Sequence, residues 1–506
     1  MLCRRFVIAM AATASLWGGE SVAIPATATL PGPKDPRILE YRPDEQVFIR
    51  PESERFLDHL IIGLNRQDNK YFLLPDMSDH TDILGSSVER VSKILFMLDF
   101  EFSHGRMMEH VPENTHLYVA VPDPEKGSTQ PHYEEKWFKD YLLERAGWSK
   151  QRVDSNVHFF KSPVPLLWAR DISKIIGFDK EGRAILGTSV QQAPEQLSAL
   201  EALQSAFPKV FVLKQYEPHI PQISPNISIE GGDLEIVVNP NGKTDLLIGR
   251  HRVLRYLRTA GLLAADAPDT TPLTNDQIES ARRAYSESFF DLPVTFVPHQ
   301  VLMEPGRGSP ELFHLDMIVT VLPPVGSSPP RAFVPTYLFE AVDALQDVRL
   351  DPQMIAKMQD EYNLVALQFE AMGYEVLRLP IADHPVRSPV NIGKYRDRTT
   401  GKSVVMVSKY PYHIPIEAQS PRDEFLQIYY DLDAAGIAFR DSHSKESLEK
   451  LVSLLDGVWA RLDAIAAKPN PIFEMTRSVF EQKGYVVKTV PDYTYGSGGI
   501  HCKILQ

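Results

Sequence analysis

The chain has 506 residues, of which 43% are hydrophobic and 24% are charged. This composition is typical of a globular protein and excludes a fibrous or largely disordered chain. The formal net charge of −13 argues against a nucleic-acid partner, because binding to phosphates needs an excess of lysine and arginine. Beyond the N-terminus, no apolar run reaches the roughly 20 residues that a membrane-spanning helix needs, so no membrane span is expected.

The first residues have the pattern of an export signal. Two arginines precede an apolar stretch over residues 6–17, and small residues typical of a cleavage site end at Ala23. We therefore expect residues 1–23 to be a cleaved signal peptide and the protein to be secreted or periplasmic. The mature chain then keeps a single cysteine, Cys502, so it forms no internal disulfide. A lone thiol in an exported protein is either used chemically or buried and inert.

The region before residue 110 is predicted to be a mainly helical N-terminal extension over residues 24–110. It begins with a proline-rich lead-in at 24–45. Apolar residues then recur at spacings of three and four over 53–65 and 87–97, which is the periodicity of amphipathic helices. We recognise no chemical motif in this region.

From residue 111 to residue 506 we expect a catalytic domain in which helices alternate with short strands. A helix followed by a strand occurs about five times, at intervals of about 60 to 85 residues. The predicted strands lie at 116–122, 157–161, 210–213, 294–298, 374–379 and 485–490. The predicted helices lie at 133–146, 197–207, 277–290, 354–372 and 471–484.

Hairpins are predicted beside several of these helix–strand pairs. Their turns lie at 179–182, at 239–242 and around Gly401, and Asn241-Gly242 is a strong signal for a two-residue turn. Repeated units of hairpin, helix and strand favour a radial array over a doubly wound sheet. We therefore predict an α/β fold of about five ββαβ-type units, arranged as a five-bladed α/β propeller that follows the N-terminal extension.

Four short motifs with acidic, basic or nucleophilic side chains lie at the ends of these units. They are W-A-R-D at 168–171, E-G-G-D at 230–233, H-L-D at 314–316 and G-S-G-G-I-H-C at 496–502. If the stretch at 314–322 is a strand, His314 and Asp316 project from the same face. Cys502 and the adjacent His501 would face opposite sides of a strand, so His314 is the better candidate base for this thiol.

Taken singly, each motif is also explained by a helix cap, an ordinary turn or a solvent-facing polar pair. Together and in this order, they resemble the guanidine-modifying superfamily, the pentein enzymes that include protein-arginine deiminases and agmatine deiminases. The closing I-H-C is most similar to agmatine deiminases, whereas residues 313–323 and 490–495 resemble the catalytic domain of protein-arginine deiminases. The resemblance covers residues 115–506 and leaves 24–110 unexplained.

This resemblance implies a hydrolase whose nucleophile is the Cys502 thiolate. Asp171 and Asp316 would hold the planar guanidinium through paired hydrogen bonds, which carboxylates match in charge and geometry. His314 would protonate the departing ammonia and then activate water against a covalent thiouronium intermediate, while Glu230 would orient His314. The residue types agree with this, because one nucleophile, one base and several carboxylates make a cation-binding covalent site. No cofactor and no metal are expected.

Further residues are weaker candidates for the substrate pocket. Asn391 lies in a segment that resembles an active-site segment of the family, or it is an ordinary turn residue. Trp168 lines the pocket or packs in the core. A clamp for the carboxylate of free arginine would come from Arg250, Arg252 or Arg307.

The expected substrate is an arginine-containing peptide or protein, because an exported enzyme with an added N-terminal region suits such a target. A small-molecule guanidine deiminase acting on agmatine or free arginine, and an amidinotransferase, are alternatives with the same chemistry. A metal-dependent hydrolase with His314, Asp316 and Glu230 as ligands, and a non-catalytic binding protein on the same fold, are alternatives of other classes. The sequence contains no D-x-[DN]-x-[DN]-G loop, so calcium dependence is not predicted.

Overall fold

The computed structural model describes most of the chain between residues 40 and 493. The described residues are 40–42, 47–64, 87–122, 135–163, 173–189, 194–216, 231–298, 314–339, 352–382, 387–411, 421–442 and 444–493. The predicted signal peptide over 1–23 lies outside the described residues. Within these ranges, no helix combines the length and the apolar character that crossing a membrane requires.

Strands in the described part of the chain form five small open sheets. The largest has the order β1-β2-β6-β7-β8, whose strands are Glu40–Arg42, Val47–Ile49, Lys174–Asp179, Ala184–Ser189 and Phe211–Tyr216. The second contains β3 (His59–Gly63), β4 (His116–Pro122) and β5 (Val157–Ser162). The others contain β9 (Leu234–Val238), β10 (Thr244–Gly249) and β11 (Val294–Val297); β12 (Thr320–Leu322), β13 (Arg331–Tyr337) and β14 (Glu375–Ile381); and β15 (Gly393–Arg396), β16 (Ser403–Lys409) and β17 (Val486–Pro491).

Four of the five sheets share one connection pattern. In each, two antiparallel strands are followed by one or more helices and by a strand that pairs in parallel with the second. The connecting helices are α6 (Pro194–Ala206), α7 (Arg250–Thr259), α8 (Asn275–Ser288), α10 (Pro352–Ala371), α11 (Pro421–Ser442), α12 (Lys445–Ala467) and α13 (Pro471–Gln482). In the sheet β3–β5 all strands are parallel, and the intervening helices are α2 (Ser87–His104), α3 (Glu135–Glu144) and α4 (Lys150–Asn156).

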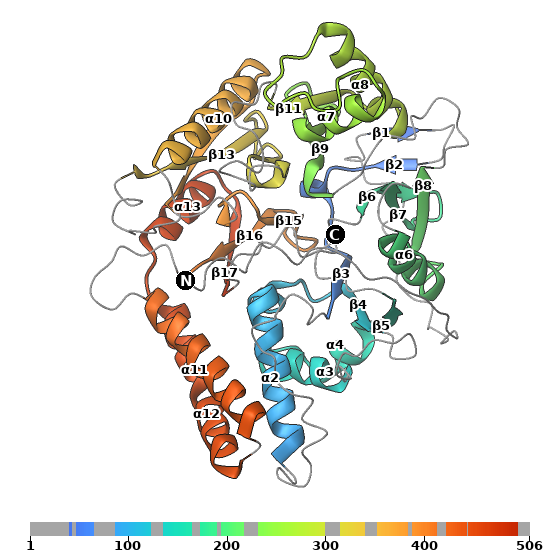
Figure 1. Ribbon diagram of the computed structural model, residues 1–506. Coiled ribbons are helices and arrows are strands. Elements are labelled where there is room, and N and C mark those ends of the chain that lie inside the picture. Colours follow the sequence, from blue (N-terminus) through green and yellow to red (C-terminus); the bar gives the residue numbers. More distant parts are fainter. Residues whose placement is uncertain are drawn as a thin grey trace.

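Hydrophobic clusters join each sheet to two others, and together they close a ring. The order is β3–β5, β6–β8, β9–β11, β12–β14, β15–β17 and back to β3–β5. Figure 1 shows the five sheets grouped around the middle of the molecule, with most helices outside them. A ring of five sheets is what a five-bladed propeller requires, and that assignment stays a prediction.

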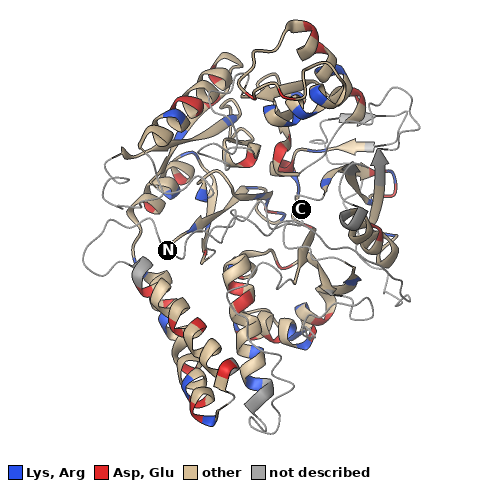
Figure 2. Cartoon of the chain, viewed as in Figure 1, with Lys and Arg blue, Asp and Glu red and all other residues tan. Residues whose placement is uncertain are grey.

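The outer helices are amphipathic. Figure 2 shows Lys and Arg interspersed with Asp and Glu along these helices, while the strands carry mostly uncharged residues. The inner faces of the same helices are apolar; in α10, Tyr362 and Phe369 are fully buried. Such a division is expected where one helix face packs on a sheet and the other meets water.

Two long helices that the sequence analysis did not predict, α11 and α12, form an arm at the lower left of Figure 1. They pack on each other and on α2 through one hydrophobic cluster that includes Leu95, Leu432 and Leu455. Ser444 caps α12, because its hydroxyl accepts a hydrogen bond from the Ser447 N–H at 3.2 Å. The arm therefore attaches the last sheet to the helices of the sheet β3–β5.

The helix predicted over residues 53–65 is wrong. This segment holds the 3-10 helix η1 (Glu52–Glu54) and the strand β3, all of whose residues are buried. A short, continuous apolar run suits a strand covered on both faces as well as a helix, so periodicity misled the prediction. Because β3 pairs with β4 and β2 pairs with β6, the described strands before residue 110 pair with strands of the region after it. The boundary of a mainly helical extension at 110 stays a prediction.

The other predicted elements are confirmed, with ends shifted by a few residues. They correspond to β4, β5, β8, β11, β14 and β17 and to α3, α6, α8, α10 and α13. The helix predicted at 87–97 is α2, which continues to His104. The hairpin turns are also formed, and Gly242 and Gly401 adopt φ values of 75° and 66°, which glycine adopts without strain.

Candidate functional site

Three predicted site residues, His314, Asp316 and Asn391, lie in the described part of the chain. The other four predicted site residues lie outside the described residues: Cys502, Asp171, Glu230 and Trp168. The candidate clamp residue Arg307 also lies outside them. Three described segments meet at the candidate site: residues 231–233 of the E-G-G-D motif, the H-L-D turn and the loop that carries Asn391.

His314 and Asp316 lie on a short helical turn and not on the predicted strand. His314 precedes the 3-10 helix η6 (Leu315–Met317), and β12 starts only at Thr320. The turn nevertheless brings the two side chains together, with 4.0 Å between His314 Nδ1 and Asp316 Oδ1. Their exposed fractions are 4% and 2%. The base and the carboxylate therefore share one buried place through a local structure different from the one predicted.

Gly232 of the E-G-G-D motif lies against His314. Gly231, Gly232 and Asp233 form the 3-10 helix η5, and all three are buried. A Cβ atom on Gly232 would lie 2.8 Å from His314 Nδ1 and 3.1 Å from its Cγ, which is closer than such atoms pack without displacement. Gly232 is thus required for close approach to the imidazole ring.

Asp233 links the two motifs, and the sequence interpretation assigned it no role. Its side chain is fully buried. Oδ2 accepts a hydrogen bond from Arg252 Nε at 2.5 Å and lies 2.8 Å from His251 Nε2. Oδ1 accepts a hydrogen bond from the backbone N–H of Leu315 at 3.3 Å. Asp233 therefore fixes the backbone directly after His314.

The predicted hairpin contained the signal for this role. A turn at 239–242 pairs Leu234 with Ile248, so Asp233 must lie beside Gly249 and the cationic residues that follow it. A Cβ atom on Gly249 would lie 2.9 Å from Asp233 Oδ1, which shows how closely the carboxylate approaches that backbone. The strand register that follows from this turn would have predicted a cationic partner for Asp233.

Two of the three candidate clamp arginines can be placed. Arg252 is buried against Asp233, with an exposed fraction of 5%, so its guanidinium is committed to the protein. Arg250 donates a hydrogen bond to the Thr271 carbonyl at 2.7 Å and lines a cavity of about 280 Å³ between α7, α8 and β11. Burial lowers the pKa of Arg250, and the Asp269 carboxylate opposes that effect.

The loop that carries Asn391 packs on η6. The Ser388 hydroxyl donates a hydrogen bond to the Met317 carbonyl at 2.7 Å, which ties the loop to the H-L-D turn. The Asn391 N–H donates to the Ser388 carbonyl at 3.2 Å, and Asn391 is 1% exposed. The polar side chain of Asn391 is therefore held in the interior next to the turn that carries His314.

A buried ion pair joins three sheets close to these turns. Lys394 of β15 contacts Glu235 of β9 and donates a hydrogen bond to Thr320 Oγ1 of β12 at 3.0 Å. Glu235 follows Asp233 by two residues, and Thr320 follows Asp316 by four. The same contact thus fixes the strands that begin at both motifs.

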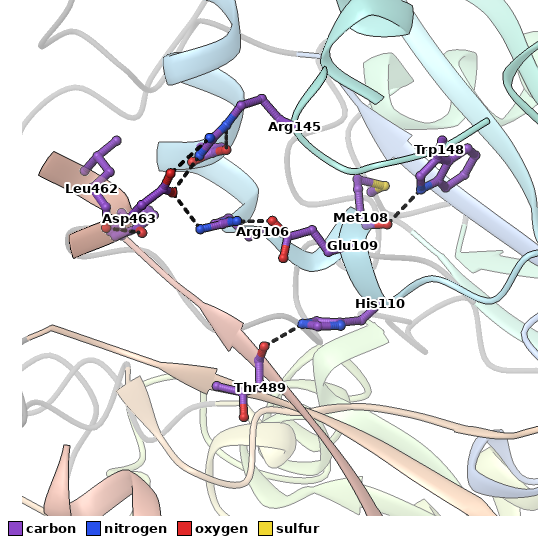
Figure 3. Close-up of polar contacts among 11 residues, drawn as sticks. Arg106, Met108, Glu109, His110, Arg145, Trp148, Leu462, Asp463 and Thr489 are labelled. Carbon is purple, nitrogen blue, oxygen red and sulfur yellow. Dashed lines mark hydrogen bonds and ion pairs between the residues drawn. The ribbon is translucent and has the colours of Figure 1, made fainter. Parts of the chain in front are cut away.

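The strand that precedes the predicted nucleophile motif is held by polar contacts (Figure 3). His110 Nε2 lies 2.6 Å from the Thr489 carbonyl. The Arg106 N–H also donates to the Pro491 carbonyl at 3.0 Å. The Tyr493 hydroxyl donates to the Leu462 carbonyl of α12 at 3.1 Å. These contacts place the end of β17 between α2 and α12.

Four charged residues beside this strand form what we call the closure cluster: Glu101, Arg106, Arg145 and Asp463. Asp463 accepts hydrogen bonds from Arg106 at 2.8 Å and from Arg145 at 3.1 Å, and Arg145 Nε also donates to Glu101 Oε1 at 3.0 Å (Figure 3). Burial raises the pKa of Glu101, and the charge of Arg145 opposes that effect. The cluster connects α2 and the end of α3 to α12.

Among the residues that the structure describes, no group of three or more histidine, cysteine, aspartate or glutamate side chains is placed to hold a metal ion. No protein-family model matches the chain, and no curated protein matches it. A functional assignment therefore depends on the motifs and on the geometry of the turns that carry them.

Proposed function

We propose that the chain is an exported protein-arginine deiminase, built as a five-bladed α/β propeller, that hydrolyses peptidyl arginine to citrulline and ammonia. The observation that carries this proposal is the buried contact between the H-L-D turn and the E-G-G-D turn. The base His314 and the carboxylate of Asp316 meet Gly232 there, and the absence of a side chain on Gly232 lets the imidazole approach the backbone. The two turns are joined by a hydrogen bond between residues 82 positions apart in the chain.

The proposed roles follow from this contact. Asp316 and Asp171 hold the guanidinium, and a buried carboxylate binds such a cation more strongly than an exposed one does. His314 lies 4.0 Å from Asp316, so a guanidinium held by Asp316 presents its nitrogen atoms to the imidazole. Cys502 supplies the nucleophile, and Glu230 orients His314. Asn391 and Trp168 complete the substrate pocket.

The chemistry proceeds in two balanced steps. The Cys502 thiolate bonds to the central guanidinium carbon, His314 gives a proton to the amino group, and the C–N bond breaks to release ammonia. The cationic thiouronium is then attacked by water, from which the neutral His314 takes a proton. The C–S bond breaks and returns the thiolate, and the second proton of the water passes to ammonia. Guanidinium and water thereby give citrulline and ammonium.

Arg252 donates to Asp233 and is not available for the carboxylate of free arginine, so one of the three candidate clamps for that substrate is removed. A peptide substrate is favoured by the predicted export signal. Arg250 and Arg307 remain candidates for that role if the substrate is free arginine. A small-molecule guanidine deiminase, an amidinotransferase and a non-catalytic binding protein are the alternatives that the experiment must distinguish.

The test is citrulline formation by the purified protein on an arginine peptide blocked at both ends, with calcium and with a chelator. We expect turnover that is lost in Cys502→Ala and falls about a hundredfold or more in His314→Gln. Arg255→Gln, an exposed position on α7, is the matched control and should retain wild-type turnover.

Free arginine, agmatine and an added amine acceptor complete the test. Ammonia release from agmatine or arginine alone would assign a small-molecule deiminase, and transfer of the amidino group to the amine would assign a transferase. Absence of turnover on every one of these substrates would overturn the deiminase proposal.

A further inference from the structure

The sheet β3–β5 carries three histidines on one face. His59, His116 and His158 come from three adjacent strands, and we call them the histidine cluster. The parallel register pairs His59 with His116 and Tyr118 with His158. Because side chains alternate along a strand, all three imidazole rings and the Tyr118 ring share the face that packs on the sheet β6–β8.

Two of the rings bind each other directly. His116 Nδ1 lies 2.9 Å from His158 Nε2, and the rings are stacked with their centroids 5.2 Å apart. Such a hydrogen bond requires one nitrogen to donate and the other to accept. When both rings are protonated every ring nitrogen is a donor, so the bond cannot form.

His59 is the most enclosed member of the cluster. It is 5% exposed, and its ring centroid lies 5.7 Å from that of Tyr118 and 5.8 Å from that of Phe211 in β8. Among the described residues, neither of its ring nitrogens has a hydrogen-bond partner. A protonated His59 would therefore place two N–H donors and a charge in an aromatic surrounding.

The charged groups around the cluster do not neutralise three imidazolium rings. Asp58 faces His59 and His116, but its carboxylate is bound by Arg398 at 2.5 and 2.7 Å. Arg398 repels a positive charge on His59. The neighbouring aromatic rings are Tyr118 on the same sheet and Phe207 and Phe211 across the seam.

We propose that the histidine cluster is an acid-sensitive latch on the seam between the sheet β3–β5 and the sheet β6–β8. At neutral pH the uncharged rings pack in the seam. Acidification charges them, breaks the bond between His116 and His158, and separates the two sheets locally. This property is independent of the proposed deiminase activity.

The titration of these groups supports the latch. Burial lowers the pKa of His59 and of His158 from 6.5 to about 4, with the neighbouring rings adding to the effect, and burial also lowers the pKa of His116. In an unfolded chain the same side chains take up protons near pH 6.5, so stability is lost as the pH falls from 6.5 towards 4. For His59 alone, the folding equilibrium becomes about 300-fold less favourable over that window.

The experiment is hydrogen–deuterium exchange of the full chain from about pH 7.5 to about pH 4.5, corrected for intrinsic exchange rates. We expect protection in β3, β5 and α6 to fall at least about tenfold in this range, while β13 and β14 keep theirs. The double variant His59→Phe with His158→Phe keeps the aromatic packing and removes two titrating groups. In this variant the seam should stay protected at the acidic end.

Two further variants keep the test decisive. His104→Phe replaces another buried histidine, stacked on Phe100 at 4.5 Å and outside the seam, and should give the wild-type pH profile. If the double variant does not fold, His158→Gln at a half-buried position should move the opening midpoint to lower pH. Unchanged protection of the wild-type seam at the acidic end, or equal loss in the wild type and in the substituted chain, would overturn the latch.

Discussion

Two regions of the described chain, the candidate site and the closure cluster, hold an aspartate by charged partners in contrasting ways. At the candidate site, Asp233 is completely enclosed, and a backbone N–H and the arginine side chain of residue 252 bind its two oxygens. In the closure cluster, Asp463 keeps 47% of its side chain exposed, and both of its partners are long arginines. A backbone N–H and one buried arginine hold the carboxylate in the first region, whereas two partly exposed arginine side chains hold it in the second.

The difference follows from the elements that carry the charges. The turns η5 and η6 meet so closely that a Cβ atom at position 232 would lie 2.8 Å from His314 Nδ1, so any larger side chain there must displace the ring. In the closure cluster, Arg106 and Arg145 reach across to α12, where about half of the Asp463 side chain stays exposed. We therefore expect the candidate site to be sensitive to shape as well as charge, and the closure cluster to be sensitive to charge alone.

The largest effect is expected from Asp233→Asn. This change keeps the shape of the side chain but removes the charge that faces the buried Arg252, and breaking a buried ion pair costs about 3 to 5 kcal/mol. Urea unfolding should show a loss of free energy in that range.

The matched control for this change is the double variant Asp233→Asn with Arg252→Met. It removes the charge that would be left without its carboxylate while keeping an apolar stem. The double variant should be more stable than Asp233→Asn alone. A cost of less than about 1 kcal/mol for the single change would contradict the contrast between the two regions.

A smaller effect is expected from Arg145→Met in the closure cluster. Methionine keeps a flexible apolar side chain against Trp459, whose ring lies 4.3 Å from the guanidinium. Glu101 loses the charged partner at 3.0 Å, so we expect unfolding in urea at about pH 8 to show a loss of about 2 to 3 kcal/mol.

The loss of stability caused by Arg145→Met should become smaller as the pH falls. Burial raises the pKa of Glu101, so the folded chain holds that proton better than the unfolded chain, and the penalty exists above the raised pKa. The difference between variant and wild type should therefore shrink as the pH falls from about 8 to about 5. Lys150→Met, in a pair whose lysine is 81% exposed, should leave the urea midpoint unchanged, and a loss that stays constant with pH would show that Glu101 is not the cause.

The elements of the fold could be predicted from the sequence more readily than the contacts of the site. Periodicity and turn residues located α8, α10 and the hairpin β9–β10, because these signals are local. The strand β3 was misread, since its burial on both faces depends on sheets formed by distant residues. The turns η5 and η6 have no local signal either, because each is stabilised by contact with the other, and so the role of Asp233 could be inferred only from strand register.

The contrast between the candidate site and the closure cluster is tested most directly by Gly232→Ala, which adds a single methyl group. The added methyl group must displace the His314 ring, whose backbone is fixed through Leu315 and Asp233, so citrulline formation should fall about tenfold or more. Urea unfolding should show a cost of only about 1 to 2 kcal/mol, typical of overpacking. Gly457→Ala adds the same methyl group to α12, where no atom lies within 4 Å, and should raise stability by about 0.5 to 1 kcal/mol with unchanged turnover. If both alanine variants keep full turnover, the contact between the two turns does not position the base, and the candidate site tolerates a change of shape as readily as the closure cluster does.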